Sequence, residues 1–156
     1  MFGILSNKKK DWIKITSKDE SFEIMFPSKT KKQHAGFFAD DNKSTGTNIY
    51  TSNKNSSFYQ LSVTRLMTPY RGSANEFLET ALNTFIVDIH EGKLIKSNFR
   101  QFKKFPTLDF AISTTNNMRG KGMIISNGNL LYCLCYIFTN ENQKDYQRFI
   151  NSFKII

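Results

Sequence analysis

The chain has 156 residues, 39% of them hydrophobic, and its 22 basic and 13 acidic residues give a formal net charge of +9. This length favours one domain that can bury a core without disulfides or metals. No apolar run approaches the roughly 18 residues of a transmembrane helix, and in the short apolar start the lysines follow rather than precede the apolar residues, unlike a signal peptide. We therefore expect a cytoplasmic protein whose charge favours solubility and anionic partners.

The first half of the chain predicts a polar arm followed by a series of strands. Residues 1–11 are expected to form the arm, and residues 12–156 a single domain. Alternating apolar and polar residues predict strands, because successive side chains of a strand point to opposite faces. The expected strands cover 12–16, 22–26, 33–39, 47–52 and 58–66, with a loop over 40–46.

A long amphipathic helix is predicted to begin after residue 73. Ser73 and Glu76 have the spacing of a capping box, in which two side chains satisfy the exposed amides of the first turn. Gly92 is expected to end the helix as a C′ glycine. One broad apolar stripe should lie flat on a sheet, and its members are Phe77, Leu78, Ala81, Leu82, Phe85, Ile86 and Ile89.

The last third of the chain predicts hairpins and a closing helix. Asn116-Asn117 and Asn127-Gly128 are expected turns between strands. The apolar spacing from Tyr146 to Phe153 predicts a helix, capped by Asn140 or Asn142. The expected strands cover 93–102, 107–114, 120–126 and 130–138, and the last is apolar on both faces, as in a strand covered on both sides.

Strands joined mostly by hairpins, together with two helices, predict the α+β class. Helices should flank an antiparallel sheet, because the strand-helix alternation of a doubly wound fold is absent. The 15 phenylalanines are expected to fill the core, since phenylalanine has no polar group, although an aromatic-lined ligand groove is the alternative.

The two cysteines, Cys133 and Cys135, are expected to be buried free thiols in a reducing compartment. They share one face of a strand, which places them poorly for a mutual disulfide. His34 and His90 are the only histidines, and no metal-binding spacing of cysteine or histidine occurs. We therefore expect no metal and no cofactor.

A catalytic constellation is not evident in the sequence. His90 is expected at a helix C-terminus, where the helix dipole stabilises a cation. Asp109 should lie on the opposite face from its apolar neighbours and tie a turn or pair with an arginine, with a catalytic carboxylate as the alternative. The Arg119–Gly122 segment enters a strand, whereas a phosphate-binding loop opens a helix. We therefore expect no enzyme, and an enzyme of unknown class is the weakest alternative.

Basic residues gather near one expected strand and one expected hairpin. Lys96, Arg100 and Lys104 are predicted to share a strand face, and Arg119 and Lys121 would extend it into a positive surface. These five residues are the candidate anion-contacting residues for nucleic acid or an anionic lipid. The alternative is a solvated sheet face that carries lysines, and no RRM, KH or cold-shock signature appears.

Six segments along the chain, in this order, carry a resemblance to known domains. They are Phe22–Pro27, Lys93–Ile95, Phe105–Phe110, Arg119–Ile125, Asn129–Tyr132 and Phe149–Phe153. Together they resemble a widespread set of bacterial domains that are similar to the Mog1/PsbP-like fold. The resemblance covers roughly residues 12–156 and is specific for fold and order rather than for activity.

The resemblance implies an antiparallel sheet flanked by helices and a non-catalytic role. Proteins of this fold act as binding or assembly partners of a small GTPase, of photosystem II or of cell-envelope lipid systems. We therefore expect a binding or accessory module with a protein partner. A basic-surface binder of nucleic acid or anionic lipid is the alternative.

Overall fold

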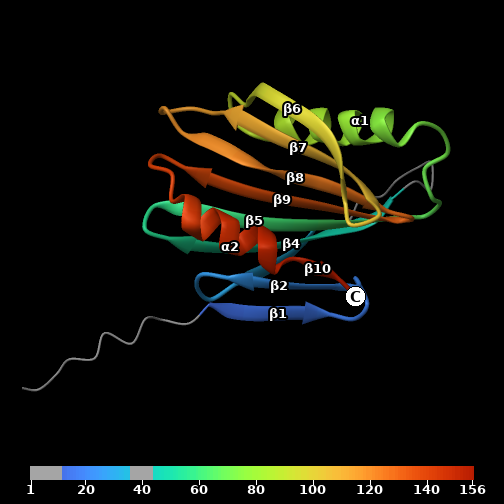
Figure 1. The fold of residues 1–156 in the computed structure, drawn as a ribbon, viewed down its shortest axis with the longest axis horizontal. Coiled ribbons are helices and arrows are strands. Elements are labelled where there is room, and N and C mark those ends of the chain that lie inside the picture. The colour runs from blue at the N-terminus through green and yellow to red at the C-terminus, as the bar shows by residue number, and fades with distance from the viewer. Residues whose placement is uncertain (1–11, 36–43) are drawn as a thin grey trace, which may run out of the picture.

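The computed structural model describes residues 12–35 and 44–156, and its main body is a large antiparallel sheet. The expected arm over residues 1–11 and residues 36–39 of the third expected strand lie outside the described residues. The large sheet has seven strands in the spatial order β3-β4-β5-β9-β8-β7-β6 (Figure 1). Their bounds are Lys31–Ala35 (β3), Ser44–Lys54 (β4), Ser57–Leu66 (β5), Lys93–Phe102 (β6), Phe105–Ser113 (β7), Arg119–Asn127 (β8) and Leu130–Phe138 (β9).

A small sheet and two helices complete the described fold. The small sheet has the order β1-β2-β10, and its strands are Ile13–Ser17, Phe22–Phe26 and Lys154–Ile155. The helices are Ala74–Val87 (α1) and Gln143–Ser152 (α2). This architecture confirms the α+β class. The expected flanking by helices holds only in part, because each face of the large sheet carries one helix and the small sheet shares a face with α2.

The first core lies between the large sheet and the layer formed by α2 and the small sheet. Tyr59, Leu61 and Val63 alternate along β5 and all point into this core, as the sequence predicts. Phe22 of β2 and Phe149 of α2 meet them from the other layer, with the Tyr59 and Phe149 ring centroids 5.3 Å apart. Aromatic side chains therefore supply much of the contact that joins the two layers.

The second core lies on the opposite face of the large sheet, beneath α1. Leu78 and Leu82 of the helix are buried against β7 and β8. In the central strand β9, the side chain of Leu134 packs in the first core, whereas those of Cys133 and Cys135 pack in the second. This two-sided burial confirms the expectation for this strand, whose apolar residues alternate between two covered faces.

Backbone φ angles in the left-handed region mark the hairpin turns. Asn116 and Asn117 both have φ of 59° between β7 and β8, which confirms the first expected turn. Gly128 also has φ of 59°, but its turn comprises Gly128 and Asn129, one residue later than expected. Asparagine and glycine enter this region more readily than other residues, which explains why they occupy these turn positions.

The first helix ends earlier than the sequence predicts. Its C-cap is Asp88, so Gly92 is not the C′ residue. Glu91, and not Gly92, has a positive φ of 55°. Gly92 is needed for space instead, because a Cβ atom there would lie 2.8 Å from the carbonyl oxygen of Ile86. The expected C′ glycine is therefore wrong.

The helix N-caps agree better with the sequence. The Ser73 side chain accepts a hydrogen bond from the amide of Glu76 at 3.4 Å. Asn142 caps α2 in the same way, accepting from the amide of Asp145 at 3.0 Å, which decides between the two expected asparagines. Strand β10 was not expected, since two residues are too short to show an alternating pattern.

Candidate functional site

An open groove lies beside α1, over the part of the large sheet that the helix leaves uncovered. The helix packs on β6, β7 and β8, whereas the floor of the groove comes mainly from β4, β5 and β9. The volume of the groove is about 550 Å³. Small-molecule sites typically have volumes of roughly 300–1,000 Å³ and mostly apolar walls, so both the size and the lining fit such a site.

One wall of the groove is formed by a second apolar stripe of α1, which lies beside the buried residues Leu78 and Leu82. Phe77, Ala81 and Phe85 follow one another at intervals of four residues, so they share one side of the helix, and all are half-buried. Thr80 and Thr84 also line the groove, but each hydroxyl donates to the carbonyl four residues earlier, at 2.9 Å. The hydroxyl groups are thereby satisfied within the helix, and the wall is chemically apolar.

The floor changes from apolar to polar with distance from the helix. Nearest α1, Leu131 and Ile137 of β9 present aliphatic side chains. Farther away, Ser62 and Thr64 of β5 and Thr47 of β4 present hydroxyl groups, and the hydroxyls of Thr47 and Thr64 are 2.8 Å apart. The groove therefore has an apolar side along α1 and a hydrogen-bonding side over β4 and β5.

The two cysteines lie under this floor as buried free thiols, which confirms that expectation. Burial raises the pKa of Cys133 to about 12, although a hydrogen bond with Ser62 opposes the rise. Burial also raises the pKa of Cys135. Because the thiolate is the nucleophile and the metal ligand, thiols held protonated in this way act as apolar packing groups.

The charge of the groove is carried by Asp88. Of the described residues that line the groove, it is the one with a charged side chain, and it is exposed at the C-cap of α1. The last turn of α1 contains no basic residue, so the partial negative charge of the helix C-terminus is not offset there. This end of the groove is therefore negative.

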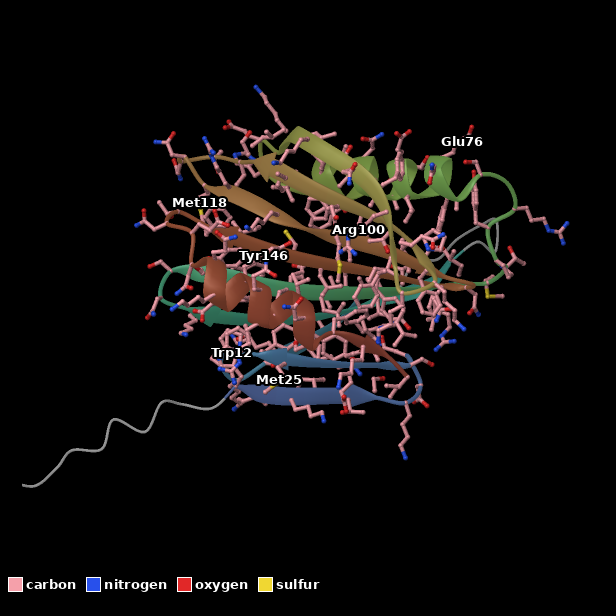
Figure 2. All side chains as sticks on the ribbon, in the orientation of Figure 1. Trp12, Met25, Glu76, Arg100, Met118 and Tyr146 are labelled. Carbon is pink, nitrogen blue, oxygen red and sulfur yellow. The ribbon has the colours of Figure 1, made fainter. Side chains whose placement is uncertain are left out.

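Four of the five candidate anion-contacting residues lie on the other face of the large sheet, beside α2. Lys96 pairs with Ala111, which pairs with Lys121, so the two lysines stand in one row across β6, β7 and β8. Arg100 and Arg119 share this face by strand alternation. Figure 2 shows Arg100 on the same side of the sheet as Tyr146 of α2. We call Lys96, Arg100, Arg119 and Lys121 the basic shelf.

The basic shelf is partly neutralised by acidic residues. Arg100 donates from Nε to Asp109 at 2.5 Å. Lys121 forms an ion pair with Glu141, and its Nζ atom lies 4.1 Å from the centroid of the Tyr146 ring. Within the described part of the chain, Lys96 and Arg119 form no ion pair, and both side chains are exposed. The shelf therefore keeps two unpaired cations.

Lys104 does not belong to the basic shelf, and its expected place on the strand face is wrong. It lies in the hairpin turn between β6 and β7, beside Lys103, whose φ is 57°. Its Nζ atom lies 5.7 Å from the centroid of the Phe105 ring. The extended spacing that put Lys104 in register with Arg100 ends where the chain reverses direction.

Asp109 and the histidines are separated in the fold. Asp109 lies on the opposite face from its apolar neighbours and pairs with Arg100, which confirms the structural reading. His34 lies on β3 at the far edge of the sheet and forms a 2.8 Å hydrogen bond with Asn48. Four strands lie between β3, which carries His34, and β7, which carries Asp109, so the backbones of these two strands are roughly 24 Å apart. His90 lies beyond the end of α1 and is exposed, so it is not in the last helical turn as expected.

A buried carboxylate that the sequence analysis missed joins the first hairpin to the large sheet. Glu20 is 7% exposed, and the hydroxyl of Tyr50 donates to its Oε1 atom at 2.5 Å. Burial, followed by this hydrogen bond, raises the pKa of Tyr50. The hydroxyl of Tyr132 donates to the backbone carbonyl of Glu20 at 2.6 Å. A glutamate in a turn carries no pattern that predicts its burial, because the partners come from distant strands.

Within residues 12–35 and 44–156, no group of three or more His, Cys, Asp or Glu side chains is placed to hold a metal ion. No described helix combines the length and the apolar character needed to cross a membrane.

Comparison with known proteins identifies the fold but no family. No protein-family model and no curated protein matches the chain. The solution structure of the cyanobacterial PsbP protein CyanoP from Synechocystis sp. PCC 6803 is similar, with a TM-score of 0.56 over 93% of this chain and 92% of that chain. The chain has a PsbP-like fold.

This PsbP-like fold confirms the resemblance found in the sequence. The identity to CyanoP is 10%, so the likeness concerns the fold alone. The extracellular domain of PknH from Mycobacterium tuberculosis is a more distant match, with 8% identity and a TM-score of 0.40 over 77% of this chain and 78% of that chain.

Proposed function

We propose that this chain is a non-catalytic binding module whose binding site is the groove beside α1. The observation that carries the proposal is the second stripe of the helix, where Phe77, Ala81 and Phe85 are only half-buried and each lines the open groove. Covering apolar surface contributes roughly 25 cal/mol per Å². An occupant of the groove would gain this free energy without any rearrangement of the sheet.

The chemistry of the groove supports binding rather than catalysis. Its thiols are protonated because burial raises the pKa of both cysteines. Its threonine hydroxyls are occupied, those of Thr80 and Thr84 by helix carbonyls and those of Thr47 and Thr64 by each other. A nucleophile needs an adjacent base to activate it, and the described lining supplies no such pair.

Titration with a neutral fluorescent probe, N-phenyl-1-naphthylamine, tests the proposal. We expect a saturable rise in fluorescence with the native chain. An Ala81→Phe variant should weaken probe binding about tenfold, because the added ring occupies the groove. Asn83→Phe is the matched control, since it adds the same ring to an exposed position of α1 outside the groove.

The fold of each variant is checked by its urea unfolding midpoint. If Ala81→Phe does not fold, Ser62→Leu fills the groove from the floor instead. The proposal is wrong if the native chain shows no saturable binding, or if the groove-filling variants bind the probe as tightly as Asn83→Phe does.

A protein partner, which the fold resemblance implies, stays a prediction. A partner segment seated in the groove would displace the probe, so the same assay detects it when candidate peptides are added. The accessory role expected from the sequence would then be exerted through this groove.

The alternative function is binding of nucleic acid or anionic lipid by the basic shelf. The observation in its favour is that Lys96, Arg100, Arg119 and Lys121 share one face of the sheet. Titration with single-stranded RNA and with anionic vesicles at low and high salt tests it, with the double variant Lys96→Glu/Arg119→Glu. Binding by phosphate contacts must weaken with salt and be lost in the variant, and salt-insensitive or absent binding contradicts this alternative.

A further inference from the structure

The groove has a direction, because its two ends differ in chemistry. Phe77 lies near the N-terminus of α1 and Asp88 at its C-cap, eleven residues later by number. At about 1.5 Å per residue, these positions are roughly 16 Å apart along the helix. The Phe77 end is apolar and stacks on Tyr70, with ring centroids 4.5 Å apart. The other end carries the carboxylate of Asp88.

Two independent features make the Asp88 end attractive to a cation. The first is the carboxylate itself, exposed at the mouth of the groove. The second is the C-terminus of α1, which carries the partial negative charge of the helix dipole, with no basic residue in the last turn to offset it. Both features act at the same end of the groove, and each contributes a modest free energy that favours binding of a positive charge.

The distribution of basic residues points the same way. The whole chain has a net charge of +9, yet none of the described residues that line the groove is a lysine or an arginine. The basic shelf lies on the opposite face of the sheet. An anionic head group in the groove would therefore meet Asp88 and no described cation, while a cationic one would meet its complement.

We infer that the groove binds a cationic amphiphile, with its apolar body along the second stripe of α1 and its positively charged group at Asp88. This inference rests on the proposed function and names the class of ligand for that same site. The apolar body covers Phe77, Ala81 and Phe85. The hydroxyl-lined side of the floor stays in contact with water or with polar substituents of the ligand.

Displacement of the neutral probe by three ligands with the same chain tests the charge assignment. Decylamine is the cation, decanol the neutral ligand and decanoate the anion. We expect decylamine to displace the probe at about a threefold lower concentration than decanoate, since a single exposed charge at a helix end has a modest effect. Higher salt should reduce this ratio, because an exposed charge is screened.

Asp88→Asn should clearly reduce the preference for decylamine, leaving the smaller part that the helix C-terminus contributes, and should leave displacement by decanol unchanged. Glu79→Gln is the matched control, because it removes the same charge from an exposed position of α1 outside the groove lining. The inference is wrong if decylamine and decanoate displace the probe equally, or if the preference in Asp88→Asn is as large as in the native chain. In both cases, probe binding would still support the groove as a site. If the native chain does not bind the probe, the proposed function itself is wrong.

Discussion

Gly122 illustrates how a single residue is fixed by its neighbour across the sheet. It lies on β8 opposite Cys135 of β9. A Cβ atom at this position would lie 1.8 Å from the carbonyl oxygen of Leu134. The obstacle is backbone in the middle of the sheet, so it cannot move aside as a flexible side chain does. The glycine is therefore required by close approach and not by its φ angle.

We expect Gly122→Ala to lower the free energy of unfolding by about 3 kcal/mol, the upper end of typical overpacking costs. Gly128→Ala is the control, because its φ is 59° and a Cβ atom there meets nothing within 4 Å. This control should cost about 1–2 kcal/mol from the left-handed backbone alone. Urea unfolding measures both, and equal costs would contradict the close-approach argument.

At the scale of elements, α1 carries two apolar stripes with different roles. Leu78 and Leu82 bury themselves against the sheet, whereas Phe77, Ala81 and Phe85 line the groove. The sequence shows both stripes as one broad stripe, and its breadth exceeds what one contact with a sheet needs. That breadth was the available signal for the groove, and it agrees with the alternative reading of some phenylalanines as ligand-lining residues.

The edge strand β6 keeps its side chains largely exposed, although α1 lies partly over it. Nine of its ten residues are exposed and the tenth is half-buried. A register shift between Leu94 and Lys96 interrupts its pairing with β7. Charged side chains and bulges are devices by which edge strands avoid pairing with other chains. This placement gives the lysines of β6 a structural reason to be there, whether or not they contact anions.

At the scale of the whole molecule, several buried groups hold their protons in the folded state. Burial is the largest cause that raises the pKa of Tyr50, Tyr132 and Tyr146, and it raises the pKa of both cysteines. In the unfolded chain the cysteines release their protons at about pH 8.5 and the tyrosines at about pH 10. Above that range the unfolded state binds fewer protons than the folded state, so the free energy of unfolding falls as pH rises.

We therefore expect the urea midpoint to be nearly constant up to about pH 8, to begin to fall as the cysteines ionise in the unfolded chain, and to fall steeply above about pH 10. Each such group contributes a slope of about 1.4 kcal/mol per pH unit once its unfolded form has ionised. Because burial raises the pKa of Tyr146, Tyr146→Phe should make the dependence of the free energy of unfolding on pH shallower by one proton. A midpoint that stays constant through about pH 11 would show that these groups ionise alike in both states.

The sequence by itself determined the local structure of this protein. Alternation predicted β2 from Phe22 to Phe26 and β9 from Leu130 to Phe138, and Ser73 and Asn142 predicted the starts of the helices. These features depend on residues close together in the chain, where backbone sterics, capping and periodic burial act directly. The order of such segments was also enough to indicate a PsbP-like fold.

The tertiary structure alone decided which surfaces are covered and which charges are paired. Strand order places α1 over three strands and leaves a groove over the others. The tertiary structure also pairs Lys121 with Glu141 and Tyr50 with Glu20. Lys104 lies in a hairpin turn and not on the strand face that alternation predicts for it. Such outcomes depend on contacts between residues far apart in the chain, and no local pattern records them.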